Sequence, residues 1–308
     1  MRAASIDIGS NSVRLLVAEV AAGGRVTPLR HERAVTRLAG GMSASGRLNP
    51  HGIGPTIAAL AAYARMARDA GAEVVVAAAT SAMREAADAP EVIGRIRAEA
   101  GLDVRVLTGA EEAEATARGV LGSGIAARSA IIVDMGGGST ECVAWDSARV
   151  LHASSTPVGV VRLHERFIAS DPPHADELAA LREAARMHAR EILSPALQAL
   201  GPGATLIGTA GTATTLAAMA LGMEHYEWAR VQGYRLDLTW LRETFESIGR
   251  MTLAERSAIA GLEPARADLI IPGIALTIEL TEAVGGGCLL VSDFGLLEGL
   301  LAIHAGGI

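Results

Sequence analysis

Short apolar runs alternate along the chain with stretches in which alanine and leucine recur at helical spacing. The apolar runs predict strands at residues 3–8, 13–19, 25–38 (with a basic loop), 73–79, 103–107, 129–135, 141–145, 149–157, 205–207 and 288–291. The alanine- and leucine-rich stretches predict helices at residues 55–70, 90–100, 110–121, 160–167, 175–199, 210–221, 238–249 and 267–284, with a closing helix after residue 295. Strands that alternate with helices, and two early hairpins, predict an α/β protein with mixed sheets.

One stretch in mid-chain, residues 131–141, combines a buried strand with a glycine turn. Three apolar residues lead into Asp134, three glycines follow, and the chain resumes with hydroxyl groups and Glu141. Glycines permit positive φ and close backbone approach, so such a turn can point several N–H groups at a phosphate. The two acids could then hold a hard divalent cation. Asp7 and Gly9 form a partial copy near the N-terminus, which predicts two related half-domains facing one phosphate site.

Length and charge narrow the classes of protein. At 308 residues the chain favours two cores of about 150 residues each. A net charge of −7 argues against a general nucleic-acid or membrane-surface binder, so we expect neither partner. All 27 basic residues are arginine. The absence of lysine excludes both a P-loop lysine and a Schiff-base lysine.

Cysteine content and hydropathy bear on the compartment. Cys142 and Cys288 lie far apart in sequence, which favours a reducing cytoplasm with both thiols buried. Asp7 interrupts the first apolar run, so a signal peptide is not predicted. The uncharged window 204–223 is long enough for a membrane span, but its glycines and threonines favour a strand, a turn and a buried helix.

Six short motifs recur in a fixed order over nearly the whole chain. They centre on Asp7 with Gly9 to Ser12, Thr80 with Arg84, Gly109 with Glu112, Asp134 with Glu141, Gly208 with Thr212, and Ser292 with Gly299. This order resembles the exopolyphosphatase and guanosine pentaphosphate phosphatase (Ppx/GppA) family, which belongs to the superfamily of actin-like, sugar-kinase and heat-shock-protein ATPases. The resemblance implies two ribonuclease H-like domains with mixed sheets and an interdomain cleft. Domain I would span residues 1–122 and be completed by a helix at 295–308, and domain II would span 123–294.

The resemblance also assigns a catalytic base. Read alone, Glu111 and Glu112 are ordinary acids in the first turn of a helix. The second glutamate, however, matches the catalytic glutamate of the family. Glu112 would then orient and deprotonate a water that attacks the terminal phosphorus in line, whereas Glu111 would stay on the helix surface.

Further roles follow from the same resemblance. Asp134 and Glu141 would hold Mg²⁺ or another hard divalent cation such as Mn²⁺, and Arg84 would contact phosphate. Asp7 is either structural or a second metal contact. The two turns would bind phosphate through residues Gly9, Ser10, Asn11, Ser12, Gly136, Gly137, Gly138 and Ser139.

The resemblance implies an enzyme that releases the terminal phosphate of inorganic polyphosphate, with guanosine pentaphosphate as the alternative substrate. A kinase of the same superfamily and a non-catalytic polyphosphate or alarmone sensor are the further alternatives. A homodimer is expected, and a basic track for the substrate would use Arg30, Arg33, Arg37 and Arg84. The chain departs from the family pattern at Gly40, Gly41 and Leu297, which puts some substrate contacts in doubt but touches neither the base nor the metal acids.

Overall fold

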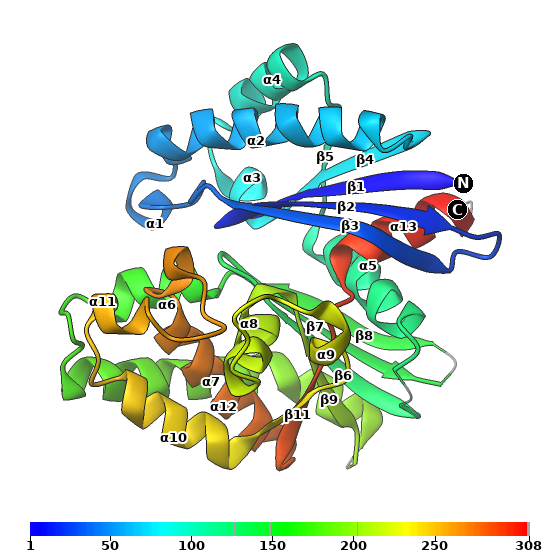
Figure 1. Cartoon of the computed structure of the whole chain (residues 1–308). Coiled ribbons are helices and arrows are strands. Elements are labelled where there is room, and N and C mark those ends of the chain that lie inside the picture. Colours follow the sequence, from blue (N-terminus) through cyan, green and yellow to red (C-terminus); the bar gives the residue numbers. More distant parts are fainter. Residues whose placement is uncertain (126, 148, 202, 307–308) are drawn as a thin grey trace. The chain divides into compact units, whose positions relative to one another are not determined.

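The computed structural model describes residues 1–125, 127–147, 149–201 and 203–306 (Figure 1). It divides the chain into two compact units. Unit 1 comprises Met1–Ser123 with Phe294–Ile308, and unit 2 comprises Gly124–Asp293. The expected closing helix at 295–308 is α13 (Leu296–Gly306), and its last two expected residues lie outside the described part of the chain.

Unit 1 is built on a five-stranded mixed sheet with the order β3-β2-β1-β4-β5. The strands are β1 (Arg2–Ile8), β2 (Ser12–Val20), β3 (Val26–Val35), β4 (Val74–Ala79) and β5 (Val104–Val106). Helices α2 (Pro50–Asp69) and α4 (Ala89–Ala100) cover the face that bears Ile6 and Ile8. Helix α13 covers the opposite face, where it packs on Ala3 and Leu16 (Figure 1).

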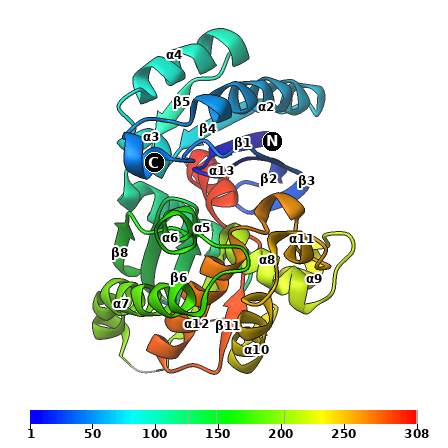
Figure 2. The ribbon, with the colours of Figure 1, turned by 90° about the vertical axis from the view of Figure 1, so that its left-hand side faces the viewer.

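Unit 2 is built on a six-stranded sheet with the order β10-β11-β9-β6-β7-β8. Its strands are β6 (Ser129–Met135), β7 (Thr140–Asp146), β8 (Val150–Thr156), β9 (Thr205–Thr209), β10 (Arg235–Asp237) and β11 (Cys288–Val291). The main helices are α6 (Val160–Phe167), α7 (Ala175–Leu200), α8 (Ala210–Ala220), α10 (Leu238–Ile248) and α12 (Ile270–Val284). Helices α7 and α12 lie side by side, and their apolar residues form one core with the sheet (Figure 2).

The two sheets repeat one plan. In unit 1, β1 pairs antiparallel with β2 and parallel with β4, and β4 pairs parallel with β5. In unit 2, β6 pairs antiparallel with β7 and parallel with β9, and β9 pairs parallel with β11. Strand β10 is an addition at the edge of the second sheet. The predicted α/β class with mixed sheets is therefore confirmed.

Every predicted strand and helix is present, some with shifted ends, and the elements that were not predicted are short. The helix expected from residue 55 begins at Pro50, because the Asn49 side chain accepts a hydrogen bond from the His51 N–H and caps the first turn. The helix expected from residue 267 begins at Ile270, because Pro264–Arg266 form a 3₁₀ turn. Sequence reading missed the short elements α1 (Met42–Ser45), α3 (Ser81–Glu85), α9 (Trp228–Val231), α11 (Leu253–Arg256) and β10.

The long uncharged window behaves as predicted, since residues 204–223 contain strand β9 and helix α8. Among the residues described by the structure, none of the helices combines the length and apolar character needed to cross a bilayer.

Within unit 1, helices α5 (Gly109–Gly122) and α13 meet through glycines. A Cβ atom added to Gly299 would lie 1.7 Å from the carbonyl oxygen of Ala115, and one added to Gly119 would lie 1.9 Å from that of Gly295. The backbones of the two helices therefore touch at this crossing. Because α5 carries Glu112 in its first turn, the crossing also fixes the backbone position of Glu112.

We expect Gly299→Ala to lower the free energy of unfolding by about 3 kcal/mol, because the helices must move apart to admit one methyl group. Gly94→Ala is the matched control. Gly94 is exposed within α4 and has open space around it, so alanine should stabilise by up to about 1 kcal/mol through helix propensity. Chemical denaturation measures both changes. A Gly299→Ala variant as stable as the wild type would contradict this description of the crossing.

Candidate active site

The predicted site residues fall into two groups, one in each unit. The first group centres on the turn after β1. The Gly9 N–H donates to the Ser12 carbonyl at 3.0 Å and closes the turn. The N–H groups of Thr36 and Arg37 donate to the Asn11 carbonyl, at 3.0 and 2.9 Å. These bonds engage carbonyl oxygens of the turn and fix the backbone of the predicted phosphate-binding residues.

Asp7, at the end of β1, has an arginine directly across the strand pair. The β1–β2 register places Arg14 opposite Asp7, and Arg14 donates to Oδ2 of Asp7 through Nε at 3.0 Å and Nη2 at 2.7 Å. The other carboxylate oxygen, Oδ1, is buried and has no hydrogen-bond partner among the described residues. Asp7 therefore already has a cationic partner within unit 1, and its predicted contact to a metal stays a prediction.

The two neighbouring glutamates of α5 take different roles because successive helix residues point about 100° apart. Glu111 forms a capping box with Thr108: its carboxylate accepts from the Thr108 N–H at 2.8 Å, and the Thr108 hydroxyl accepts from the Glu111 N–H at 3.2 Å. The bonds from Thr108 to its carboxylate hold the pKa of Glu111 below its usual value. Glu111 is thus a helix cap, as its place in the first turn predicted.

Glu112 turns inward and is only 5% exposed. Nη1 of Arg84 donates to Glu112 at 2.6 Å and to the Leu107 carbonyl at 3.0 Å. Arg84 therefore bridges the end of β5 and the start of α5, and it fixes the rotamer of the Glu112 carboxylate. The structure brings together the predicted base and the predicted phosphate-contacting arginine.

The second group lies in unit 2, around the turn after β6. The Gly136 N–H donates to the Ser139 carbonyl at 3.0 Å, which repeats the bond made by Gly9. The N–H groups of Val160 and Val161, at the start of α6, donate to the carbonyls of Gly136 and Gly137 at 3.0 and 2.9 Å. As in unit 1, the carbonyl side of the turn is tied to the fold.

Asp134 and Glu141 face each other across the β6–β7 pair and are both buried. Directly opposed residues of antiparallel strands share a face, with Cβ atoms about 4.5–5.5 Å apart. The Ser155 hydroxyl, on β8 opposite Glu141, donates to Oε1 of Glu141 at 2.7 Å. Ser155 thus orients one of the two predicted metal acids.

These residues suit a magnesium ion that is completed by substrate and water. Within the described ranges, three or more His, Cys, Asp or Glu side chains nowhere gather closely enough to hold a metal by themselves. Magnesium is commonly bound by one or two carboxylates, with waters and substrate phosphates filling the other positions. The opposed pair Asp134 and Glu141, beside a glycine turn, provides such a partial set.

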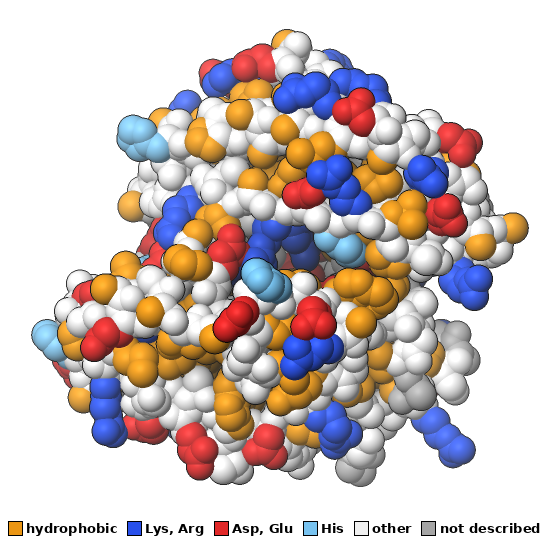
Figure 3. Space-filling view, in the orientation of Figure 1, with side chains coloured by type: hydrophobic (Ala, Val, Ile, Leu, Met, Phe, Trp, Pro, Cys, Tyr) orange, Lys and Arg blue, Asp and Glu red, His pale blue; other side chains and the backbone are white. Residues whose placement is uncertain are grey.

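Two contact residues of the site escaped the sequence reading. Arg14 had a local signal, because a four-residue turn between paired strands puts residues 7 and 14 opposite each other. Ser155 had a weaker signal: it lies 14 residues from Glu141 on the next strand, and a register shift between Ala144 and Trp145 alters the hairpin pairing. Of the expected basic track, Arg30 is engaged by Glu32 at 2.7 Å and Arg84 by Glu112 at 2.6 Å. Figure 3 shows basic and acidic side chains interspersed over the side of the protein that it draws.

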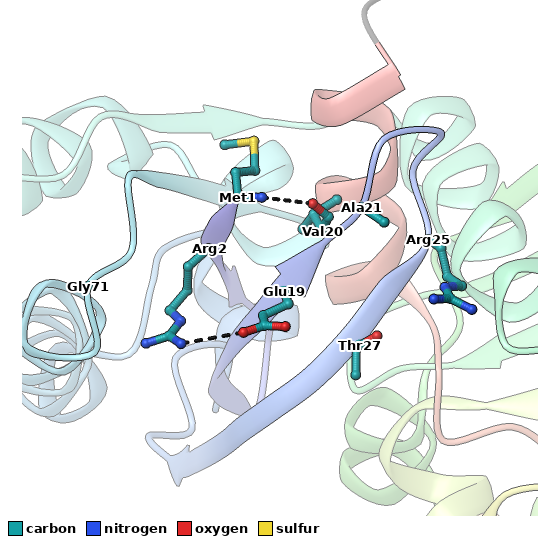
Figure 4. Close-up of a pocket in the computed structure, with 8 residues that line it drawn as sticks. All are labelled: Met1, Arg2, Glu19, Val20, Ala21, Arg25, Thr27 and Gly71. Carbon is teal, nitrogen blue, oxygen red and sulfur yellow. Dashed lines mark hydrogen bonds and ion pairs between the residues drawn. The ribbon is translucent and has the colours of Figure 1, made fainter.

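A cavity of about 490 Å³ lies at the opposite end of the β1–β2 pair from the turn (Figure 4). Its lining carries both signs of charge: Arg2 contacts Glu19 at 3.4 Å, and the N-terminal ammonium donates to the Val20 carbonyl at 3.0 Å. None of the predicted site residues lines it.

Sequence comparison gives the family. The Ppx/GppA phosphatase family model matches residues 16–305, and the chain belongs to this family. It is 38% identical over 322 residues to exopolyphosphatase 2 of Mycobacterium tuberculosis, covering 99% of each protein. It is 30% identical over 304 residues to exopolyphosphatase 1 of Mycobacterium bovis, covering 98% of this chain and 87% of that protein. The chain is a hydrolase of phosphoric anhydride bonds.

Solved structures agree. The Ppx/GppA family member of Aquifex aeolicus has a TM-score of 0.81 and 33% identity, covering 99% of this chain and 97% of that one. An exopolyphosphatase from Cytophaga hutchinsonii has a TM-score of 0.88 and 28% identity, covering 100% and 99%. The two-domain actin-like ATPase fold implied by the sequence motifs is therefore confirmed.

The two cysteines differ, and the expectation that both are buried is wrong for Cys288. Cys142, beside Glu141 in β7, is fully buried, and burial raises the pKa of its thiol to about 12. Cys288 starts β11 and is partly exposed beside Arg235, whose Nη2 lies 3.0 Å from the sulfur.

We expect a thiol reagent at neutral pH to label one cysteine in the native chain and two after unfolding in guanidinium, because a buried, protonated thiol does not react. Mass spectrometry of the labelled peptides identifies the site. Rapid native labelling of Cys142 would show that the strand carrying Glu141 is open to solvent.

Proposed function

We propose that the chain is an exopolyphosphatase, which hydrolyses the terminal phosphoanhydride bond of inorganic polyphosphate with the help of Mg²⁺ or Mn²⁺. The observation that carries this proposal is the similarity to exopolyphosphatase 2 of M. tuberculosis, which extends over 99% of both proteins. The acids that the reaction needs are present as Glu112 in unit 1 and the opposed pair Asp134 and Glu141 in unit 2.

In the proposed reaction, the Glu112 carboxylate accepts a proton from a water molecule while the water oxygen attacks the terminal phosphorus. The bond from that phosphorus to the bridging oxygen breaks, and the shortened polyphosphate leaves with the bridging oxygen. Arg84 holds Glu112 by its contact of 2.6 Å and keeps the carboxylate in one place. Its remaining N–H groups suit a phosphate oxygen, since guanidinium presents five donors.

The backbone turns supply the proposed phosphate contacts. Gly9 to Ser12 and Gly136 to Ser139 form matching turns whose carbonyls are engaged elsewhere in the fold, as the bonds to Asn11 and Gly136 illustrate. N–H groups in such turns attract anions. A divalent ion on Asp134 and Glu141 would neutralise charge on the transferred and leaving phosphate oxygens.

The test compares two adjacent glutamates. We expect Glu112→Gln to lower orthophosphate release from medium-chain polyphosphate at least about 100-fold, because the amide cannot accept the proton. Glu111→Gln is the matched control and should keep near wild-type release, since Glu111 caps α5 from its surface. Guanosine pentaphosphate and ATP serve as parallel substrates. An equal loss of phosphate release in the two variants would contradict the role of Glu112. Faster phosphate release from guanosine pentaphosphate than from polyphosphate would make guanosine pentaphosphate the substrate.

A second pair of variants tests the metal acids. We expect Ser155→Ala to weaken Mn²⁺ binding by about 10- to 100-fold, because Glu141 loses the hydrogen bond that orients it. Ser154→Ala is the control: it removes a neighbouring hydroxyl that has no hydrogen-bond partner among the described residues. Electron paramagnetic resonance of free Mn²⁺ measures the Mn²⁺ affinity of the two variants. Equal affinity in the two variants would show that Ser155 does not support a metal ligand.

A further inference from the structure

The turns after β1 and β6 sit on the same framework, so their aspartates hold equivalent positions. Asp7 and Asp134 are each the second-last residue of the strand before the turn. Each turn is closed by one bond of 3.0 Å from its first glycine, and each preceding strand has an antiparallel neighbour on one side and a parallel neighbour on the other.

The residues in register with the two aspartates differ in charge. In unit 1, the row across β4, β1, β2 and β3 consists of Ala78, Asp7, Arg14 and Arg33. In unit 2, the row across β9, β6, β7 and β8 consists of Thr209, Asp134, Glu141 and Ser155. The first row has two arginines and one acid, a formal charge of +1. The second has two acids and no base, a formal charge of −2.

Two of the three charge units that separate the rows come from one equivalent position, the residue opposite the aspartate, and the third comes from Arg33 against Ser155. In unit 1 the residue opposite the aspartate is Arg14, which places two N–H groups on one oxygen of the buried Asp7. Charge-assisted bonds of this kind are among the stronger hydrogen bonds in proteins, and they position a fixed cation against the carboxylate. In unit 2 the same position is Glu141, a second carboxylate on the same face.

We propose that Arg14 supplies in unit 1 the positive charge that a divalent ion supplies in unit 2. The chain then binds a single metal ion, on Asp134 and Glu141, and Asp7 is not a metal ligand. This inference rests on the metal role proposed above. It assigns the exchangeable cation to one copy of the repeated turn and a permanent cation to the other, so that the turn of unit 1 keeps its geometry when metal is removed.

The test counts bound ions. Mn²⁺ binding in the presence of inorganic phosphate is followed by electron paramagnetic resonance for the wild type, Asp7→Asn, Asp134→Asn and Glu141→Gln. We expect one ion per wild-type chain, one in Asp7→Asn with little change in affinity, and affinity at least about tenfold weaker in the other two. A second wild-type ion, or loss of the ion in Asp7→Asn, would overturn the inference.

The same titration separates this inference from the proposed function. The expected binding pattern without phosphate release from polyphosphate would reject the proposed activity and leave the metal assignment standing. A wild-type chain that binds no Mn²⁺ would overturn this inference and the metal role together.

Thermal unfolding provides a second readout, free of metal, in chelator. Arg14→Gln should lower Tm because it leaves a buried carboxylate without its cation. Adding Asp7→Asn to that variant should raise Tm again, since the uncompensated charge is then gone. A double variant no more stable than Arg14→Gln would show that the Asp7–Arg14 pair is not what the arginine provides.

Discussion

The pairing register of two hairpins is the constraint on which the proposed metal and phosphate binding depends. In each unit an aspartate is the second-last residue of a strand, a four-residue turn reverses the chain, and the returning strand places one residue directly opposite that aspartate. Because side chains alternate between the faces of a strand, a slip of one residue would send the partner to the other face. The bond across each turn, from Gly9 to Ser12 and from Gly136 to Ser139, secures that register.

Glu112, the proposed base of unit 1, is positioned by a different set of contacts. Thr108 fixes where α5 begins, Arg84 holds the Glu112 carboxylate, and the glycine contact with α13 fixes the helix itself. The last of these joins segments from the two ends of the chain, since α13 follows unit 2 in sequence and packs within unit 1. Cap, ion pair and helix crossing all act on a single side chain, and they restrict it before any substrate binds.

The sequence alone predicted the long helices and strands and the glycine turns, because the signals for these elements are local. Apolar runs marked all strands of both sheets except β10, and the helix predicted at 90–100 ends at Gly101, which takes the left-handed conformation common after the last residue of a helix. Elements of three to five residues were missed, since one helical turn or a three-residue strand such as β10 shows no periodicity. Strand order was also beyond local reading.

The site shows the same division. The acids and glycines of the two turns could be named from their motifs, and Glu112 needed the family resemblance, because a first-turn glutamate is ordinarily a cap. Partners across strands needed coordinates. Arg14 follows from the regular register of the β1–β2 hairpin, whereas the register of the β7–β8 hairpin shifts between Ala144 and Trp145, so counting residues from the turn does not lead to Ser155. The family resemblance offered Asp7 as a possible metal contact. The ion pair of Asp7 with Arg14 became visible only in the structure.

The most direct test of the account is the destination of the water oxygen. Polyphosphate is hydrolysed in ¹⁸O-labelled water, and ³¹P nuclear magnetic resonance locates the label. Attack of water on the terminal phosphorus predicts that each released orthophosphate carries one ¹⁸O atom and that the shortened chain carries none. Unlabelled orthophosphate, with the label at the new end of the chain, would contradict the reaction assigned to Glu112.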